Sequence, residues 1–326
     1  MNDVALFAAV GTPLTADETL DRPALESHVV DQFRGGMTGV LIGGTMGLMQ
    51  LLTDATYRQL VEIGVGAAAG RGEVMVGIGD TSFARTRERI RFVNKQREVD
   101  GVVCLSPFLV KFTQDELVDY FRALADESRV PVYLYDLPGL TGVKLSLETV
   151  LAVATHPNIR GIKCSSELGW SRQLADLAPA GFRVIFAQAD LVDVLLHADI
   201  TQHLDGIFSL APDWTAGIAR AAAAGDWEQA SAMQQKLSAL LRVVKEFGVF
   251  PSFTVLLNAR GIAGNYCPAP LRPLNEAQRE RLLASPIVAD LLAGNPIQPA
   301  PARHDNGNGT AVPSMDPIRP AAATAR

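Results

Sequence analysis

The sequence contains few of the residues that build disulfide frameworks or metal sites. Its three cysteines, Cys104, Cys164 and Cys267, are odd in number and widely spaced, and they form no C-x-x-C pair. The five histidines show no metal-ligand spacing with cysteines or carboxylates. This pattern argues against both a disulfide framework and a zinc site. We expect free thiols in a reducing compartment and no bound metal.

Long apolar runs and an excess of basic residues are also missing. No stretch approaches the roughly 18 consecutive apolar residues of a membrane-spanning helix, and no basic region precedes the apolar residues near the N-terminus. Lys+Arg 29 against Asp+Glu 35 gives a formal net charge of −6, which argues against nucleic acid or an anionic membrane as a partner. With 48% hydrophobic residues the chain can bury a large core. We expect a soluble cytoplasmic protein.

Short apolar runs alternate with amphipathic, helix-like segments along most of the chain. This alternation is typical of βα units that form a parallel sheet. An open doubly wound sheet usually carries G-x-G-x-x-G after its first strand, and this chain does not. Eight runs therefore predict an α/β fold, a closed (β/α)8 TIM barrel over residues 1–225. The runs start 22 to 35 residues apart and cover residues 6–10, 39–42, 74–78, 102–105, 132–135, 161–163, 184–186 and 206–210.

The character of the sequence changes after the barrel. Three further helix-like segments, at residues 226–245, 251–262 and 276–292, predict a C-terminal three-helix extension over residues 226–295. From residue 296 to residue 326 the chain is rich in Pro, Ala, Asn and Gly, with hardly any large apolar side chain. Such a composition cannot bury enough surface to offset the entropy of ordering, so we expect a disordered tail.

A glycine-rich turn closes the second apolar run. In barrels of this kind the chemistry lies where strands end and βα loops begin. Here the run leads into Gly43-Gly44-Thr45-Met46-Gly47, whose backbone N–H groups and threonine hydroxyl can approach a small anion such as a carboxylate. A plain tight turn is the alternative interpretation.

The fifth and sixth runs end in residues suited to imine chemistry. Alternation places Tyr133 and Tyr135 on one face of a strand, and either can reach the barrel mouth as a proton donor. Lys163 ends the next run. Burial disfavours the ammonium form of lysine, and the neutral amine is the nucleophile that forms Schiff bases. Taken alone, Lys163 is better explained as a surface lysine or as one paired with a nearby carboxylate. An amine, a phenol and an anion-binding turn at one mouth together indicate imine catalysis on a 2-oxo acid.

At these motifs the sequence resembles the superfamily of pyruvate-dependent class I aldolases that includes dihydrodipicolinate synthase and N-acetylneuraminate lyase. The resemblance spans about residues 5–290. Residues 44–47 resemble the G-[ST]-T-G turn of the superfamily, residues 135–138 with 141–142 resemble Y-N-x-P…[ST]-G, and residues 161–163 resemble G-x-K.

The resemblance implies a fold, an assembly and a set of site residues. Lys163 forms the Schiff base, Tyr135 acts as general acid and base, and Thr45 helps to hold the carboxylate. The fold is a barrel with C-terminal helices, assembled as a homo-oligomer, either a tetramer made of dimers or a dimer. The substrate-binding residues that we predict are Gly44, Met46, Gly47, Ser165, Gln188, Asp190, Ile207 and Ser209.

Several positions depart from the superfamily pattern. Gly139-Leu140 replace the segment in which dihydrodipicolinate synthases carry an arginine for a second carboxylate. Leu109 follows Phe108 where the superfamily has a relay tyrosine that enters the neighbouring subunit, and Asp136 replaces the asparagine beside the catalytic tyrosine.

Residues 137–145 most resemble the sugar-acid lyase branch, in which the residue corresponding to Ser165 faces substrate hydroxyls. The sequence therefore predicts a lyase that reversibly cleaves a 2-oxo acid, a sugar acid, to pyruvate and an aldehyde without metal or organic cofactor. A dehydratase or hydratase-aldolase is an alternative, because elimination and aldol cleavage share one enamine. A non-catalytic barrel that binds a 2-oxo acid is a third interpretation, motivated by the missing relay tyrosine.

Overall fold

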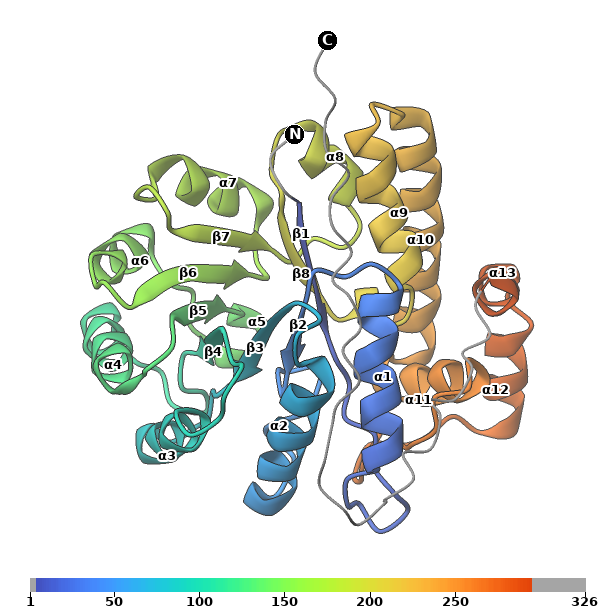
Figure 1. The fold of residues 1–326 in the computed structure, drawn as a ribbon, viewed down its shortest axis with the longest axis horizontal. Helices are drawn as coiled ribbons and strands as arrows, with labels where there is room; N and C mark the ends of the chain where they lie inside the picture. The colour runs from blue at the N-terminus through green and yellow to red at the C-terminus, as the bar shows by residue number, and fades with distance from the viewer. Residues whose placement is uncertain (1–3, 295–326) are drawn as a thin grey trace, which may run out of the picture.

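The protein is described here by a computed structural model that covers residues 4–294. Its centre is a closed barrel of eight parallel strands in the order β1 to β8, with β8 paired to β1 (Figure 1). The predicted (β/α)8 barrel is confirmed. The strands are β1 Ala5–Ala9, β2 Gly39–Ile42, β3 Glu73–Gly77, β4 Gly101–Leu105, β5 Val132–Asp136, β6 Ile159–Cys164, β7 Arg183–Phe186 and β8 Gln202–Asp205.

Helices that follow the strands surround the barrel, apart from the short helix α5, which lies at its centre in this view (Figure 1). Side-chain caps define their starts: Thr113 and Glu116 form a reciprocal capping box, and the side chains of Asp21 and Ser146 each accept a backbone N–H. These helices are α1 Arg22–Arg34, α2 Asp54–Ala68, α3 Phe83–Val93, α4 Gln114–Glu127, α5 Pro138–Thr141, α6 Leu147–Ala154, α7 Leu168–Leu177, α8 Val192–His197 and α9 Pro212–Ala223.

Four helices follow the barrel within the described residues, rather than the three expected from the sequence. They are α10 Trp227–Phe247, α11 Val249–Ala259, α12 Glu276–Leu283 and α13 Pro286–Gly294. The segment expected to be one helix over residues 276–292 is two, because Pro286 starts a new helix and cannot continue the preceding one. The long helix α10 packs beside α9 (Figure 1). The predicted tail at residues 296–326 lies outside the described residues.

The eighth strand is not where the apolar pattern placed it, and that prediction was wrong. The strand is Gln202–Asp205, and the run at residues 206–210 contains the 3₁₀ helix η1, Ile207–Ser209. The polar-looking strand is buried on both faces, with Leu204 inside the barrel and His203 bonded through Nε2 to the Ile200 carbonyl. The Asp205 carboxylate accepts the Ile207 N–H, which turns the chain out of the sheet.

Tyr133 fills the amino-terminal end of the barrel interior. Glycines on both neighbouring strands make room for its ring, since a Cβ on Gly101 or Gly161 would lie 2.7 or 2.8 Å from ring carbons. Its hydroxyl accepts a hydrogen bond of 3.1 Å from Arg183, which also pairs with Glu73 at 2.6 Å. This end of the barrel is therefore filled by a packed polar cluster, and a site is expected at the opposite, carboxyl-terminal end.

Two absences apply to residues 4–294. No helix in this range is long and apolar enough to cross a membrane. The same residues contain no group of three or more His, Cys, Asp or Glu side chains placed to hold a metal ion.

Candidate active site

Lys163 and Tyr135 meet inside the carboxyl-terminal end of the barrel. They lie directly opposite each other on the paired strands β5 and β6, so their side chains share the interior face. The Lys163 Nζ donates a 2.8 Å hydrogen bond to the Tyr135 phenol oxygen and lies 4.0 Å from the centre of its ring. Each residue is only 4% exposed. A buried amine thus has a phenol as its hydrogen-bond partner, which is the arrangement that imine chemistry requires.

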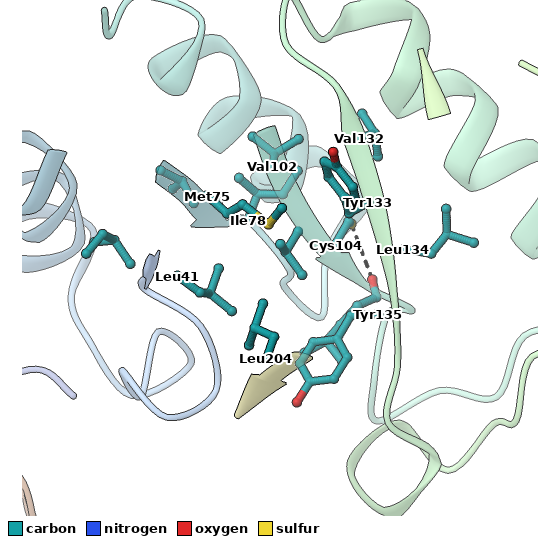
Figure 2. Packing of buried hydrophobic residues seen from close by; sticks show 14 of the residues in the cluster. Leu41, Met75, Ile78, Val102, Cys104, Val132, Tyr133, Leu134, Tyr135 and Leu204 are labelled. Atoms are coloured by element: carbon teal, nitrogen blue, oxygen red, sulfur yellow. Dashed lines mark hydrogen bonds between the residues drawn. The ribbon is translucent and has the colours of Figure 1, made fainter. Parts of the chain in front are cut away.

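The structure distinguishes the two tyrosines that alternation left equivalent. Figure 2 shows their rings pointing toward opposite ends of β5, with Tyr135 beside Leu204. Tyr133 is bonded to Arg183 at the amino-terminal end of the barrel, whereas Tyr135 is bonded to Lys163 at the carboxyl-terminal end. Of the two tyrosines, Tyr135 is the one that contacts Lys163.

Thr45, in the turn after β2, contacts the Tyr135 hydroxyl. Its hydroxyl oxygen is 3.3 Å from the Tyr135 hydroxyl oxygen. The turn begins at Gly43, whose φ of 63° is in the left-handed region that glycine adopts without strain. The Thr12 hydroxyl donates a 2.6 Å bond to the Gly47 carbonyl and holds the end of the same turn. Met46 packs over Gly206 at the end of β8, so it supplies an apolar wall beside Thr45.

Three groups around Tyr135 favour its ionised form. Burial alone would raise the pKa of the phenol. The Lys163 ammonium, together with hydrogen bonds from Lys163, Thr45 and Ser165, outweighs that effect, and the net result is a lowered pKa. A phenol with a lowered pKa beside an amine can exchange a proton with it and with a bound substrate.

A sequence profile of the dihydrodipicolinate synthetase family matches residues 3–286. The chain belongs to the dihydrodipicolinate synthetase family. Members are pyruvate-dependent class I lyases and synthases, so the chain is an enzyme of this class. A 4-hydroxy-tetrahydrodipicolinate synthase from Limosilactobacillus fermentum is 31% identical over 305 residues, which cover 90% of this chain and 95% of that protein. The Stenotrophomonas maltophilia enzyme of the same name is 33% identical over 299 residues, covering 89% of this chain and 95% of that one.

Solved structures share the fold at lower identity. A prophage protein of the dihydrodipicolinic acid synthase family from Escherichia coli, in complex with pyruvate, has a TM-score of 0.81 at 23% identity and covers 89% of this chain and 99% of its own. The N-acetylneuraminate lyase of Proteus mirabilis has a TM-score of 0.81 at 22% identity, covering 88% and 98%. The superfamily expected from the motifs is therefore confirmed, while synthase and lyase both occur among the similar proteins.

Three of the predicted substrate-binding residues of this dihydrodipicolinate synthetase family member lie around the loops after β6 and β7. Ser165 is half-buried and contributes to the lowered pKa of Tyr135. The Gln188 side-chain amide donates a 2.7 Å bond to the Ser166 carbonyl, so it holds the loop after β6. Asp190 is exposed on the loop that leads into α8.

The two predicted residues after β8 are buried in their own turn. Ile207 is 3% exposed, and its N–H is bonded to Asp205. The Ser209 side chain is fully buried, and its hydroxyl donates a 2.8 Å bond to the Gly206 carbonyl. Both residues were chosen from the misplaced strand, and the strand in fact ends at Asp205. Burial raises the pKa of that carboxyl, an effect that the Lys163 charge partly opposes.

Leu109 stands on the loop after β4, where the family has its relay tyrosine. It is 89% exposed and has a φ of 78°, which is unusual for a leucine, and the next residue, Val110, is 62% exposed. Neither Leu109 nor Val110 can donate a proton from its side chain. Neither residue therefore replaces the relay tyrosine.

An ion pair with a buried carboxylate lies next to the site, and the sequence reasoning missed it. The Asp136 carboxylate, which directly follows Tyr135, pairs with Lys144 and accepts a 3.1 Å bond from the Leu145 N–H. The signal was the aspartate at the asparagine position of the motif, with a lysine eight residues later. Sequence alone does not show that the two meet, because the turn between them decides it.

Proposed function

We propose that this enzyme cleaves a 2-oxo sugar acid to pyruvate and an aldehyde through an imine on Lys163. The observation that carries the proposal is the 2.8 Å hydrogen bond between Lys163 and Tyr135 inside the barrel mouth. The neutral amine of Lys163 adds to the C2 carbonyl, and water leaves to form an iminium. The iminium then serves as an electron sink.

Tyr135 supplies the proton transfers. As the C3–C4 bond of the substrate breaks, its electron pair moves into the iminium and forms an enamine, while the C4 hydroxyl loses its proton to the Tyr135 oxygen. The enamine is then protonated at C3, and water hydrolyses the resulting imine, which releases pyruvate and frees Lys163. The lowered pKa of Tyr135 supports its role as the base. Thr45, 3.3 Å away, orients the phenol.

The surroundings of the pair support the sugar-acid assignment. The turn at residues 43–47 offers backbone N–H groups for the α-carboxylate. Ser165 faces the hydroxyl-bearing part of the substrate. Leu140, in place of the arginine expected of dihydrodipicolinate synthases, supports a substrate without a second carboxylate at that position.

Trapping with pyruvate and borohydride tests the proposal. We expect an irreversible adduct on the peptide containing Lys163, with a mass equal to pyruvate minus water plus two hydrogens, because borohydride reduces an imine. Mass spectrometry of Lys163→Ala and Lys163→Arg should show no adduct. An adduct of wild-type yield in Lys163→Ala would contradict the assignment of Lys163 as the residue that forms the imine.

A panel of 2-oxo acids then separates cleavage from dehydration. Cleavage releases pyruvate and an aldehyde in equal amounts. A dehydratase would release a new 2-oxo acid of unchanged carbon number and no pyruvate. Product analysis by NMR decides between the two reactions of the same imine.

A further inference from the structure

Lys144 has no free N–H donor. Its Nζ pairs with the Asp136 carboxylate, donates a 2.9 Å bond to the Ser166 hydroxyl and lies 3.0 Å from the centre of the Trp170 ring. An ammonium group has three donors, and the carboxylate, the hydroxyl and the π face take all three. A substrate anion would find no unoccupied donor, so Lys144 is not placed to bind substrate.

The ion pair between Asp136 and Lys144 is largely buried and is not a surface ion pair. The Asp136 side chain is fully buried, and the Lys144 side chain is 33% exposed. A buried carboxylate without a partner is strongly destabilising, whereas a hydrogen-bonded partner in good geometry compensates its desolvation. Lys144 is the cation that meets this need, since the other bond to the Asp136 carboxylate comes from a backbone N–H.

The partners of Lys144 connect it to both catalytic strands. Asp136 is the residue after Tyr135 on β5, and Ser166 is three residues after Lys163, just beyond β6. The Ser165 N–H donates a 3.0 Å bond to the Asp136 carbonyl, which ties the same two strand ends together.

We propose that Lys144 is a positioning residue that clamps the ends of β5 and β6 and thereby sets the geometry between Tyr135 and Lys163. The ammonium holds one strand through Asp136 and the other through Ser166. The inference rests on the proposed imine function. Its effect falls on proton transfer, because a positioned acid or base loses efficiency when the geometry shifts by a fraction of an ångström.

Proton exchange on pyruvate isolates this step without knowledge of the natural aldehyde. In D₂O the enzyme should replace the methyl protons of pyruvate by deuterium through the enamine, and NMR follows the rate. We expect Lys144→Met to lower the exchange rate at saturating pyruvate by roughly 10–100-fold. End-point trapping with borohydride should stay at the wild-type yield, because it needs only Lys163.

Three further variants separate positioning from simple charge neutralisation. Ser166→Ala should lower exchange in the same direction by a smaller factor, and Lys144→Met/Ser166→Ala should be no slower than Lys144→Met. In Asp136→Asn/Lys144→Met no unpaired carboxylate remains, but the connection between the ends of β5 and β6 is still lost. The rate of methyl-proton exchange should therefore stay low. Recovery of the wild-type rate in that double variant would reduce Lys144 to a counterion and overturn the proposal.

Lys236 provides a matched control. It pairs with Asp290 at 2.8 Å and lies 5.7 Å from the centre of the Trp214 ring, but it belongs to α10, outside the barrel. Lys236→Met should keep both exchange and trapping. A wild-type exchange rate in Lys144→Met would refute the clamp. If Lys144→Met does not fold, a wild-type exchange rate in Ser166→Ala refutes it instead. Trapping by Lys163→Ala would instead refute the proposed function itself.

Discussion

Tyr133 and Tyr135 occupy the same face of one strand and differ only in what surrounds them. Burial raises the pKa of Tyr133, and the Arg183 charge and hydrogen bond partly oppose that effect. For Tyr135, the Lys163 charge and three hydrogen bonds reverse the effect of burial. The pKa of each phenol is therefore set by the balance between its burial and the charges and hydrogen bonds around it.

This difference leads to a prediction for the two Tyr→Phe variants. Tyr135→Phe should keep pyruvate trapping while it lowers methyl-proton exchange by roughly 10²–10⁴-fold, the usual contribution of a positioned acid or base. Tyr133→Phe should keep both and lose about 0.5–1.5 kcal/mol of unfolding free energy with the hydrogen bond from Arg183. Exchange rates in D₂O and urea denaturation measure these effects. Equal losses of exchange in both variants would contradict the assignment of Tyr135.

Elements of the barrel fit together because small residues face large ones. Gly161 on β6 sits under the Tyr133 ring, and a Cβ there would also lie 2.4 Å from the Arg183 carbonyl oxygen. Backbone cannot move aside as a flexible side chain can. Gly161, two residues before Lys163, is thus a packing requirement of the strand that carries this lysine.

Gly161→Ala should therefore destabilise the barrel. We expect a loss of roughly 1–3 kcal/mol in unfolding free energy, the usual cost of overpacking a core. Gly139→Ala is the control, since a Cβ there meets no atom within 4 Å and the residue lies in the short helix α5. Urea denaturation of both variants tests this. A Gly161→Ala variant as stable as wild type would contradict the packing argument.

The strand β8 carries a buried histidine that makes stability depend on pH. Burial lowers the pKa of His203 to about 4, opposed only by its bond to the Ile200 carbonyl. In the unfolded chain the imidazole binds its proton below about pH 6.5, while the folded protein stays neutral down to about pH 4. The unfolded state is therefore favoured as the pH falls through this window.

At pH 5 this linkage should cost about 2 kcal/mol of unfolding free energy relative to pH 7.5. His203→Gln should show a smaller difference between the two pH values by about that amount. Denaturant titrations at both pH values measure it. His28, whose pKa is lowered to about 3 by burial and by the Arg260 charge, should leave a residual dependence in the variant. An unchanged difference in His203→Gln would contradict the argument.

At the scale of the whole molecule, one surface loop is apolar where solvent would favour polar residues. Leu109 and Val110 project from the mouth side of the barrel at 89% and 62% exposure. Burial of such side chains against a second copy would stabilise an assembly through the removal of apolar surface from water.

We expect the purified protein to be a homo-oligomer, a dimer or a tetramer, at micromolar concentration. Leu109→Ser/Val110→Ser should shift the population toward smaller species, because less apolar surface is removed from water on association. Light scattering after size-exclusion chromatography gives the mass of each species. A wild-type monomer would contradict the prediction.

The sequence by itself determined the barrel and placed Lys163 at the end of one of its strands. Seven of the eight apolar runs coincide with strands because each strand is buried on both faces, and the ends of the fifth and sixth runs lie at the same end of the barrel because β5 and β6 are adjacent and parallel. The capping box formed by Thr113 and Glu116 is likewise local in sequence, since its bonds span three residues.

Only the tertiary structure decided the rest. Gln202–Asp205 forms a strand because the barrel and its helices bury it on both sides. The pattern of polar and apolar residues within this segment does not predict a strand. The choice between Tyr133 and Tyr135 depends on Arg183 and Lys163, which are 50 and 28 residues away along the chain. Lys144 reaches Ser166 across 22 residues. Contacts between side chains distant in sequence depend on strand register and turn geometry, which local patterns of apolar and polar residues do not encode.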